Sequence, residues 1–305
     1  MREVIPGSLA GERLDRAVAM ITGASRSEVA AAIAAGEVWV NGAPVTKVST
    51  RLAADDVVEG EVAAAVRIER ASPDVGVEVS VVHEDADVIV VDKPVGLVVH
   101  PGSGNRSGTL VQGLLVRYPE LVDVGEPYRP GIVHRLDKGT SGLLVVARTA
   151  EAYESLVAQL AARQVERVYV TLAWGAFESP SGVVDAPIGR STSDPTRMAV
   201  ASEGREARTR YDVVASFTDP VPATLLECRL ETGRTHQIRV HLAAIGHPVV
   251  GDDQYGGARP SLPAPRPLLH ARRLSFTHPR TRDRATFETG LPADFEAVLR
   301  GLSSR

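Results

Sequence analysis

The sequence predicts an α+β fold built on a mixed, largely antiparallel sheet, with a smaller unit in front of it. Segments with strand-like and helix-like patterns alternate without the regular strand-helix-strand beat of a doubly wound fold. Residues 8–62 have the pattern of a separate compact unit, and strands and turns dominate from residue 79 onward. We therefore expect a small domain over 8–62, a linker over 63–78 and a large domain over 79–305.

The small domain is predicted to contain two helices and a hairpin. Apolar residues recur at helical spacing over 14–21. Ser25 and Glu28 form a possible capping box for a second, Ala-rich helix, which stops at Gly36. Asn41-Gly42 lies between two apolar runs, and this dipeptide is a strong signal for a tight hairpin turn.

Apolar periodicity also predicts the elements of the large domain. A cap at Thr235 is expected to start a further helix that ends at Gly246. Cys228 lies in a strand-like apolar run, so an inert, buried thiol is expected there. The predicted strands are 88–92, 97–101, 165–174, 209–216 and 223–230, and the predicted helices are 109–117, 150–163 and 295–302.

Composition points to a globular protein of the cytoplasm. No run is long enough to cross a membrane as a helix, and the N-terminus lacks a signal-peptide pattern. The formal net charge of −4 argues mildly against nucleic-acid binding, but the distribution of charge matters more than its sum. Basic residues cluster over 266–284 and again over 234–241, which favours a localised site for a polyanion.

The most informative stretch is 131–149, where a charged turn precedes an apolar strand. A buried strand needs no charged cluster at its start, whereas a site does, because a rigid strand can hold a loop carboxylate in place. Asp137 is the only acid in the stretch, and nearby cations favour the ionised form of a carboxyl. An ionised, fixed carboxylate suits a nucleophile or a base. The polar residues of this turn are His134, Arg135, Asp137 and Lys138.

This stretch resembles the signature of the RluA-type pseudouridine synthases, which is His-Arg-Leu-Asp followed by a Gly/Thr/Ser turn and an apolar strand. The resemblance implies that Asp137 is the catalytic residue. It also implies that Arg135 enters the space vacated by an extracted base or holds a phosphate, and that His134 and Lys138 contact RNA. The resemblance covers about 80–300, and it implies the fold of a pseudouridine synthase catalytic domain.

Two further segments carry the same resemblance. Arg167 and Tyr169 match the family's pattern of a basic residue two places before a tyrosine, and the resemblance implies that Tyr169 packs on the target base. Residues 231–241 resemble the family's Gly-Arg-x-His-Gln-x-Arg block. In the family the second arginine of that block pairs with the catalytic aspartate, which maps to Arg239 here. The residues of this block expected to contact RNA are Arg234 and His236.

The first unit resembles the S4 RNA-binding fold. The matching text is Arg13-Leu14-Asp15, Ser25-Arg26-Ser27 and the Gly36-x-Val38-x-Val40-Asn41-Gly42 hairpin. In that fold the paired helices grip RNA. The resemblance therefore implies phosphate contacts from Arg13, Arg26 and Lys47.

Together these features predict an enzyme that isomerises uridine in RNA to pseudouridine. The base detaches from the ribose at nitrogen and re-attaches through carbon, so no redox change occurs and no cofactor or metal is needed. S4-type text ahead of an RluA-type domain is similar to family members that act on large-subunit ribosomal RNA, and we expect that substrate. We expect a monomer with RNA as its partner and no membrane association.

Two other classes of protein stay open at this point. The chain could be a catalytically silent RNA-binding protein, although Asp137 and its two predicted partners argue for an active enzyme. It could be a metal-dependent phosphoesterase, because several histidines lie near Asp252 and Asp253, but their spacing does not favour shared ligation. Lys93 and Lys138 lie in turn-like text and are expected to be solvated, and no serine-hydrolase elbow is present. The histidines in question are His236, His241 and His247.

Overall fold

The computed structural model describes residues 1–22, 24, 26–61, 70–102, 105–194 and 196–303. These residues form two compact units, Met1–Arg70 and Ala71–Arg305, each with its own apolar core. The predicted linker 63–78 lies largely outside the described residues, and the predicted cap Ser25 lies outside them entirely.

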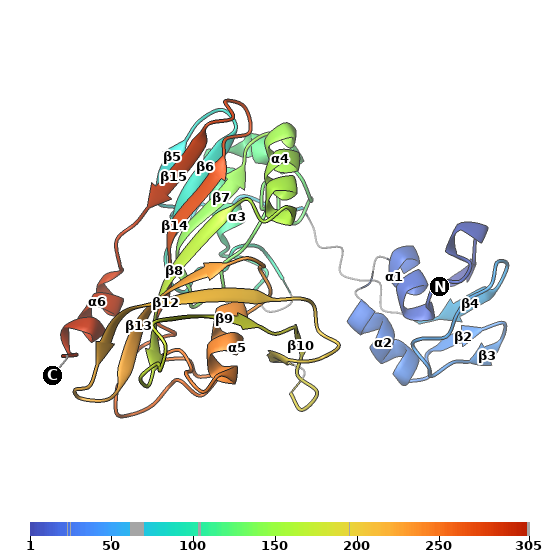
Figure 1. The fold of residues 1–305 in the computed structure, drawn as a ribbon. Helices are drawn as coiled ribbons and strands as arrows, with labels where there is room; N and C mark the ends of the chain where they lie inside the picture. The colour runs from blue at the N-terminus through green and yellow to red at the C-terminus, as the bar shows by residue number, and fades with distance from the viewer. Residues whose placement is uncertain (23, 25, 62–69, 103–104, 195, 304–305) are drawn as a thin grey trace. The chain divides into compact units, whose positions relative to one another are not determined.

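The first unit packs two helices, α1 (Leu14–Thr22) and α2 (Arg26–Ala34), beside a short antiparallel sheet (Figure 1). The predicted hairpin is confirmed, with Asn41 at φ 52° and Gly42 at φ 77°. Two left-handed residues in succession match the twist of the flanking strands. The sheet has the order β1-β4-β2-β3 among the described residues, with β1 (Arg2–Val4), β2 (Val38–Val40), β3 (Ala43–Pro44) and β4 (Val57–Gly60).

The second unit is built on one large mixed sheet (Figure 1). In the part of the chain that the structure describes, the strand order is β5-β6-β7-β14-β8-β13-β12-β9, and β15 pairs with β14. The β7–β14 pair is parallel, and the other neighbouring strands of this sheet run antiparallel. The predicted mixed, largely antiparallel sheet is therefore confirmed. The strands are β5 (Val81–Glu84), β6 (Val88–Lys93), β7 (Ser141–Ala147), β8 (Glu166–Trp174), β9 (Ser181–Asp185), β12 (Arg208–Phe217), β13 (Ala223–Leu230), β14 (Leu269–Thr277) and β15 (Arg284–Glu288), and a separate pair is formed by β10 (Ile188–Arg190) and β11 (Met198–Val200).

The helices of the second unit begin and end close to their predicted positions. Thr109 and Gln112 form a capping box at the start of α3, and the side chain of Thr149 caps α4. The cap predicted at Thr235 is wrong by one residue, because His236 takes the N-cap position of α5 with a left-handed φ of 57°. The helices are α3 (Leu110–Arg117), α4 (Ala150–Ala161), α5 (Gln237–Ala244) and α6 (Ala293–Arg300), with a 3-10 turn, η2 (Pro119–Asp123).

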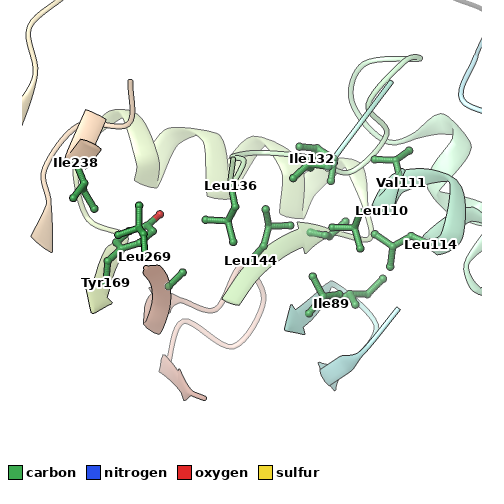
Figure 2. Close-up of a cluster of buried hydrophobic side chains, with 14 of the residues drawn as sticks. Ile89, Leu110, Val111, Leu114, Ile132, Leu136, Leu144, Tyr169, Ile238 and Leu269 are labelled. Carbon is green, nitrogen blue, oxygen red and sulfur yellow. The ribbon is translucent and has the colours of Figure 1, made fainter. Parts of the chain in front are cut away.

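The main core of the second unit runs from the α3 side of the sheet to the start of β8 (Figure 2). Ile89, Leu110 and Leu114 lie at one end of it, and Tyr169 lies at the other beside Ile238 and Leu269. Cys228 is buried in the same cluster, as predicted, and burial raises the pKa of its thiol. An apolar wall therefore reaches the segment that carries Asp137, since Leu136 belongs to this cluster.

One predicted strand is wrong. Residues 97–101 do not form a strand, because Val98 makes only an isolated bridge to Thr109 before the chain turns into α3. Apolar residues here fill the core rather than pair in the sheet, and Val99 is almost fully buried. Separately, none of the helices among the described residues combines the length and apolarity that a membrane span requires.

Candidate active site

Asp137 lies in the turn that precedes β7. Leu136 anchors this turn in the core, and the backbone N–H of Thr140 donates to the Asp137 carbonyl oxygen at 3.0 Å. The loop that contains Gly96 also supports this turn, because the backbone N–H of Gly96 donates to the Lys138 carbonyl oxygen at 2.8 Å. The carboxylate is thus held by fixed backbone, while its side chain keeps 19% of its surface exposed.

Arg239 on α5 and His236, the N-cap residue of that helix, face the carboxylate of Asp137. Arg239 Nη1 donates to Asp137 Oδ2 at 3.3 Å, and His236 Nε2 lies 3.9 Å from the same oxygen. The Asp137–Arg239 pair links positions 102 apart in the sequence. The structure therefore brings together the aspartate and the arginine that the sequence singled out.

Arg239 is itself fixed by a second aspartate. Asp252, which is fully buried, accepts hydrogen bonds from Arg239 Nε at 2.6 Å and Nη2 at 2.9 Å. Burial alone would lower the pKa of Arg239, but the hydrogen bonds and negative charges of Asp252 and Asp137 raise it above its ordinary value. Two-point binding of this kind sets the plane of a guanidinium. Arg239 is consequently a rigid, permanently charged donor aimed at Asp137.

Tyr169 faces the same space from β8. Its ring belongs to the apolar core and is 5% exposed, and burial raises the pKa of its hydroxyl to about 12. Asp137 and Tyr169 line the same cavity, and the negative charge of Asp137 contributes to that rise. The phenol is therefore neutral at physiological pH.

Asp137, Tyr169 and His236 line a cavity of about 590 Å³, and Arg239 supports Asp137 from behind this lining. It is large enough for a nucleotide, and its lining is rich in arginine. Arg135 crosses it, since Arg135 Nη2 donates to Thr235 Oγ1 at 3.0 Å. Arg234 also lines the cavity, with its Nε bonded to the Glu206 carbonyl oxygen. Further cationic lining comes from Arg129, Arg163, Arg167 and Arg205.

The other residues predicted to contact RNA lie in different settings. The ring of His134 lines the cavity, and burial lowers its pKa to about 3, so it is neutral. Lys138 is exposed next to the cavity rather than in its lining. In the first unit Lys47 is exposed, Arg13 pairs with the buried Asp15 at 2.9 Å, and the side chain of Arg26 lies outside the described residues.

In the basic cluster predicted over 266–284, four of the six arginines pair with carboxylates, as Arg266 does with Asp294 at 2.7 Å and Arg280 with Asp87 at 2.6 Å. Arg273 and Arg284 both contact Glu166. Arg272 and Arg282 are exposed, so the cluster keeps some positive charge at the surface, but the cavity gathers more arginines than these two.

The histidines considered as metal ligands each have a separate partner. His241 bonds Thr209 and the Ala186 carbonyl oxygen, His247 bonds the Trp174 carbonyl oxygen, and Asp252 is committed to Arg239. Elsewhere Asp85, Asp87 and His278 lie close enough to one another to hold a cation. Their side chains are already engaged with His83, Arg280 and backbone N–H groups.

Lys93 was expected to be solvated, and the structure contradicts this. Its side chain is fully buried at the end of β6, where Nζ donates to the carbonyl oxygens of Pro94 at 2.8 Å and Leu97 at 2.9 Å. Burial lowers its pKa to about 8, which the negative charge of Asp137 partly opposes. Lys93 thus shapes the loop whose Gly96 braces the Asp137 turn.

Burial of Lys93 predicts a pH effect on stability. Between pH 8 and 10.5 the unfolded chain binds the proton that the folded chain has released, so the free energy of unfolding should rise with pH in that window. Relative to Lys93→Met, the wild type should gain up to about 3 kcal/mol across it. Urea unfolding of both proteins at a series of pH values measures this, and parallel profiles would contradict it.

Asp252 and Lys93 are the functional neighbours that sequence reasoning missed. Asp252 was noted only as a possible metal ligand, and Lys93 only as a turn residue. The signal for Asp252 was present, since a buried acid needs a cation and Arg239 lies on the preceding helix. The text around Lys93 resembles the first block of the same RluA-type family, but nothing in it indicated that the lysine is buried, because its partners are two backbone carbonyl groups.

The arginine-lined cavity beside a fixed carboxylate defines a site for a polyanion, and comparison with known proteins identifies the class of protein. Residues 87–244 match the model of the RNA pseudouridylate synthase family, and residues 12–58 match the S4 domain. The chain belongs to the RNA pseudouridylate synthases and carries an S4 domain. It is therefore an isomerase that acts on RNA, and neither a silent binding protein nor a phosphoesterase is favoured.

Named relatives span nearly the whole chain. It is 44% identical to ribosomal large subunit pseudouridine synthase D of Nitrosomonas europaea, over 98% of this chain and 86% of that protein. It is 42% identical to an uncharacterized RNA pseudouridine synthase of Bacillus subtilis, over 95% of this chain and 94% of that protein. Among solved structures, human RNA pseudouridylate synthase domain containing 1 is 26% identical, with a TM-score of 0.58 over 77% of this chain and 91% of that one.

Proposed function

We propose that this protein isomerises specific uridines of large-subunit ribosomal RNA to pseudouridine, with Asp137 as the catalytic residue. The observation that carries the proposal is the Asp137 carboxylate, held 3.3 Å from a clamped arginine inside an arginine-lined cavity. The relatives named as large-subunit synthases supply the substrate class.

In the proposed reaction the target base leaves its stack and enters the cavity. Unstacking costs a few kcal/mol, which stacking on an aromatic ring and phosphate contacts can return. Tyr169 would support the extracted base from the β8 side. Arg239, fixed by Asp252, would keep Asp137 ionised and oriented toward the nucleotide, and Asp137 would start the exchange of the glycosidic bond.

Arginines at the cavity edge would hold the RNA backbone. Arg135 is the strongest candidate, because it is exposed and spans from the Asp137 turn to Thr235. In the first unit Arg13 and Lys47 would add phosphate contacts, and Arg26 is proposed with them on the S4 resemblance. We also propose that the enzyme works as a monomer and without a metal, since the lining around Asp137 is rich in arginine, which would repel a metal cation.

Arg135→Gln should weaken RNA binding through loss of a phosphate contact. The slope of log affinity against log salt should become shallower by about 0.7 for single-stranded RNA. Arg117→Gln is the matched control. Arg117 lies at the end of α3, pairs with Glu84 and is not part of the cavity lining. Filter binding at several salt concentrations measures both slopes, and an unchanged slope for Arg135→Gln would remove the contact.

Mapping of pseudouridine tests the proposed substrate directly. Ribosomal RNA is isolated from cells with and without the gene, and pseudouridines are located by chemical labelling and sequencing. We expect sites in the large-subunit RNA to disappear with the gene and to return on incubation with purified protein in EDTA. An unchanged map would refute the ribosomal substrate, and activity that EDTA abolishes would refute the metal-free reaction.

A further inference from the structure

Arg167 is a buried cation that the mechanism above does not use. It lies two residues before Tyr169 on β8, so both side chains point to the same face of the sheet. Its side chain lines the cavity, and the residue is only 8% exposed. Burying a guanidinium without a counter-charge costs several kcal/mol, so such a residue needs an explanation.

No carboxylate among the described residues pairs with Arg167. The two acids of the cavity lining have other partners, because Asp137 pairs with Arg239 and Glu231 with Arg210. Arg167 Nε is buried with no hydrogen-bond acceptor in the described part of the chain. The guanidinium therefore lies at the cavity with a donor that no described residue takes up.

His134 adds a second donor beside Arg167. The backbone N–H of Val145 donates to His134 Nε2 at 3.2 Å, so in the neutral ring the proton resides on Nδ1. Nδ1 is buried and lacks an acceptor among the described residues. His134 and Arg167 line the same cavity, and the charge of Arg167 helps to lower the pKa of this ring. Two donors with no acceptor call for an oxygen atom that only accepts.

The order of groups along the cavity indicates which oxygen this is. Across β14, Tyr169 pairs with Ala271 and Arg167 pairs with Leu274. On the other side of β14, Ser141 at the end of the Asp137 turn pairs with His270. The register therefore places Tyr169 nearer than Arg167 to the Asp137 turn. A uracil placed on Tyr169 with its ribose at Asp137 turns the opposite edge of the ring, the carbonyl at C4, toward Arg167.

We propose that Arg167, with the Nδ1–H of His134, binds the oxygen on C4 of the extracted uracil and so selects uridine. This inference rests on the proposed function. Cytosine carries an amino group at C4, which would meet two donors and leave all three groups unsatisfied. A buried mismatch of this type discriminates strongly between substrates.

The same contact would act on the reaction as well. When the bond from ribose C1′ to N1 breaks, its electron pair stays on the base, and the negative charge spreads to the ring oxygens. A fixed guanidinium in a buried site stabilises such charge. The pair then forms the bond from C1′ to C5, the C5 proton leaves to solvent and N1 takes one up, so the atoms balance.

Gly233 keeps the place of this guanidinium free. A Cβ on Gly233 would lie 2.7 Å from Arg167 Nη1, the far end of a flexible side chain. Gly233→Ala should therefore displace Arg167 without removing a charge and without straining the backbone. It offers a second variant that is independent of any substitution of Arg167 itself.

The first test compares Arg167→Met, Arg167→Lys and Gly233→Ala with the wild type and with Arg117→Gln as control. We expect the single-turnover rate of Arg167→Met to fall by about 100-fold, with RNA affinity and its salt slope unchanged and Tm equal or higher. Arg167→Lys should recover part of the rate, and Gly233→Ala should lose rate at unchanged Tm. A lowered Tm for Arg167→Met would mean that Arg167 has a structural role, and a shallower salt slope would mean that it contacts a phosphate. Either result overturns the proposal.

The second test places 4-thiouridine or 2-thiouridine at the target position of the RNA, since sulfur is a weaker acceptor than oxygen. With the wild type, 4-thiouridine should slow turnover, and Arg167→Met should show no additional loss. The two proteins should respond alike to 2-thiouridine. If the two proteins differ in their response only to 2-thiouridine, or to neither analogue, the C4 contact is refuted although the enzyme still makes pseudouridine. If the wild type is inactive on RNA that contains uridine, the proposed function itself is refuted.

Discussion

Asp137→Asn should abolish pseudouridine formation by at least about 10⁴-fold while RNA affinity stays unchanged. The amide is the same size and can still accept from Arg239 Nη1, so the turn before β7 should keep its shape. It carries no negative charge and is a far weaker nucleophile or base. Single-turnover release of label from the C5 position of target uridine measures the loss.

Asp253→Asn is the matched control for this experiment. Asp253 is exposed and follows Asp252 directly, yet it is not among the residues that line the cavity. It should retain the wild-type rate. If Asp137→Asn kept more than a small fraction of the rate, another residue would have to start the reaction.

Asp252→Asn should be the most destabilising change at the site. The amide oxygen can still accept from Arg239 Nη2 and from the backbone N–H groups of Gln254 and Tyr255. The amide NH2, however, meets the Arg239 Nε donor, and the buried guanidinium loses the negative charge of Asp252. Breaking a buried ion pair on one side costs about 3–5 kcal/mol. Turnover should fall as well, because the freed guanidinium can swing onto Asp137. Urea unfolding and single-turnover kinetics measure the two effects.

The double variant Asp252→Leu with Arg239→Met separates stability from function. Replacing both partners of a buried pair by apolar groups is often neutral or stabilising. The double variant should therefore unfold at a higher urea concentration than Asp252→Asn, yet remain inactive. Recovery of activity together with stability would show that Arg239 is only a structural residue.

The sequence alone predicted the fold class and most elements of the large domain because their apolar periods are long and regular. β8 (Glu166–Trp174) and β13 (Ala223–Leu230) were predicted almost to the residue. The error at 97–101 arose because apolar residues that fill a core beside a helix read the same as those in a buried strand. Apolar periodicity indicates which residues are buried, but a buried segment need not pair with a neighbouring strand.

The site was predictable only where family-like text marked it. Asp137, Tyr169 and Arg239 were singled out. The structure places Asp137 and Tyr169 in the lining of one cavity and Arg239 behind them in contact with Asp137, and their roles await the experiments above. The burial of Lys93 and Arg167 could not be predicted from sequence. Lys93 donates to backbone carbonyl groups, and Arg167 has no carboxylate partner among the described residues. Whether a cation has a counter-charge depends on tertiary contacts that no local pattern encodes.

The position of β14 (Leu269–Thr277) has a consequence for biosynthesis. This strand enters the sheet between β7 and β8, although it is made more than 90 residues after β8 ends. Until it emerges from the translating ribosome, β7 and the Asp137 turn have an open edge and no lateral support on that side. We therefore expect the nascent enzyme to stay inactive, and exposed to aggregation, until nearly all of the chain has been synthesised.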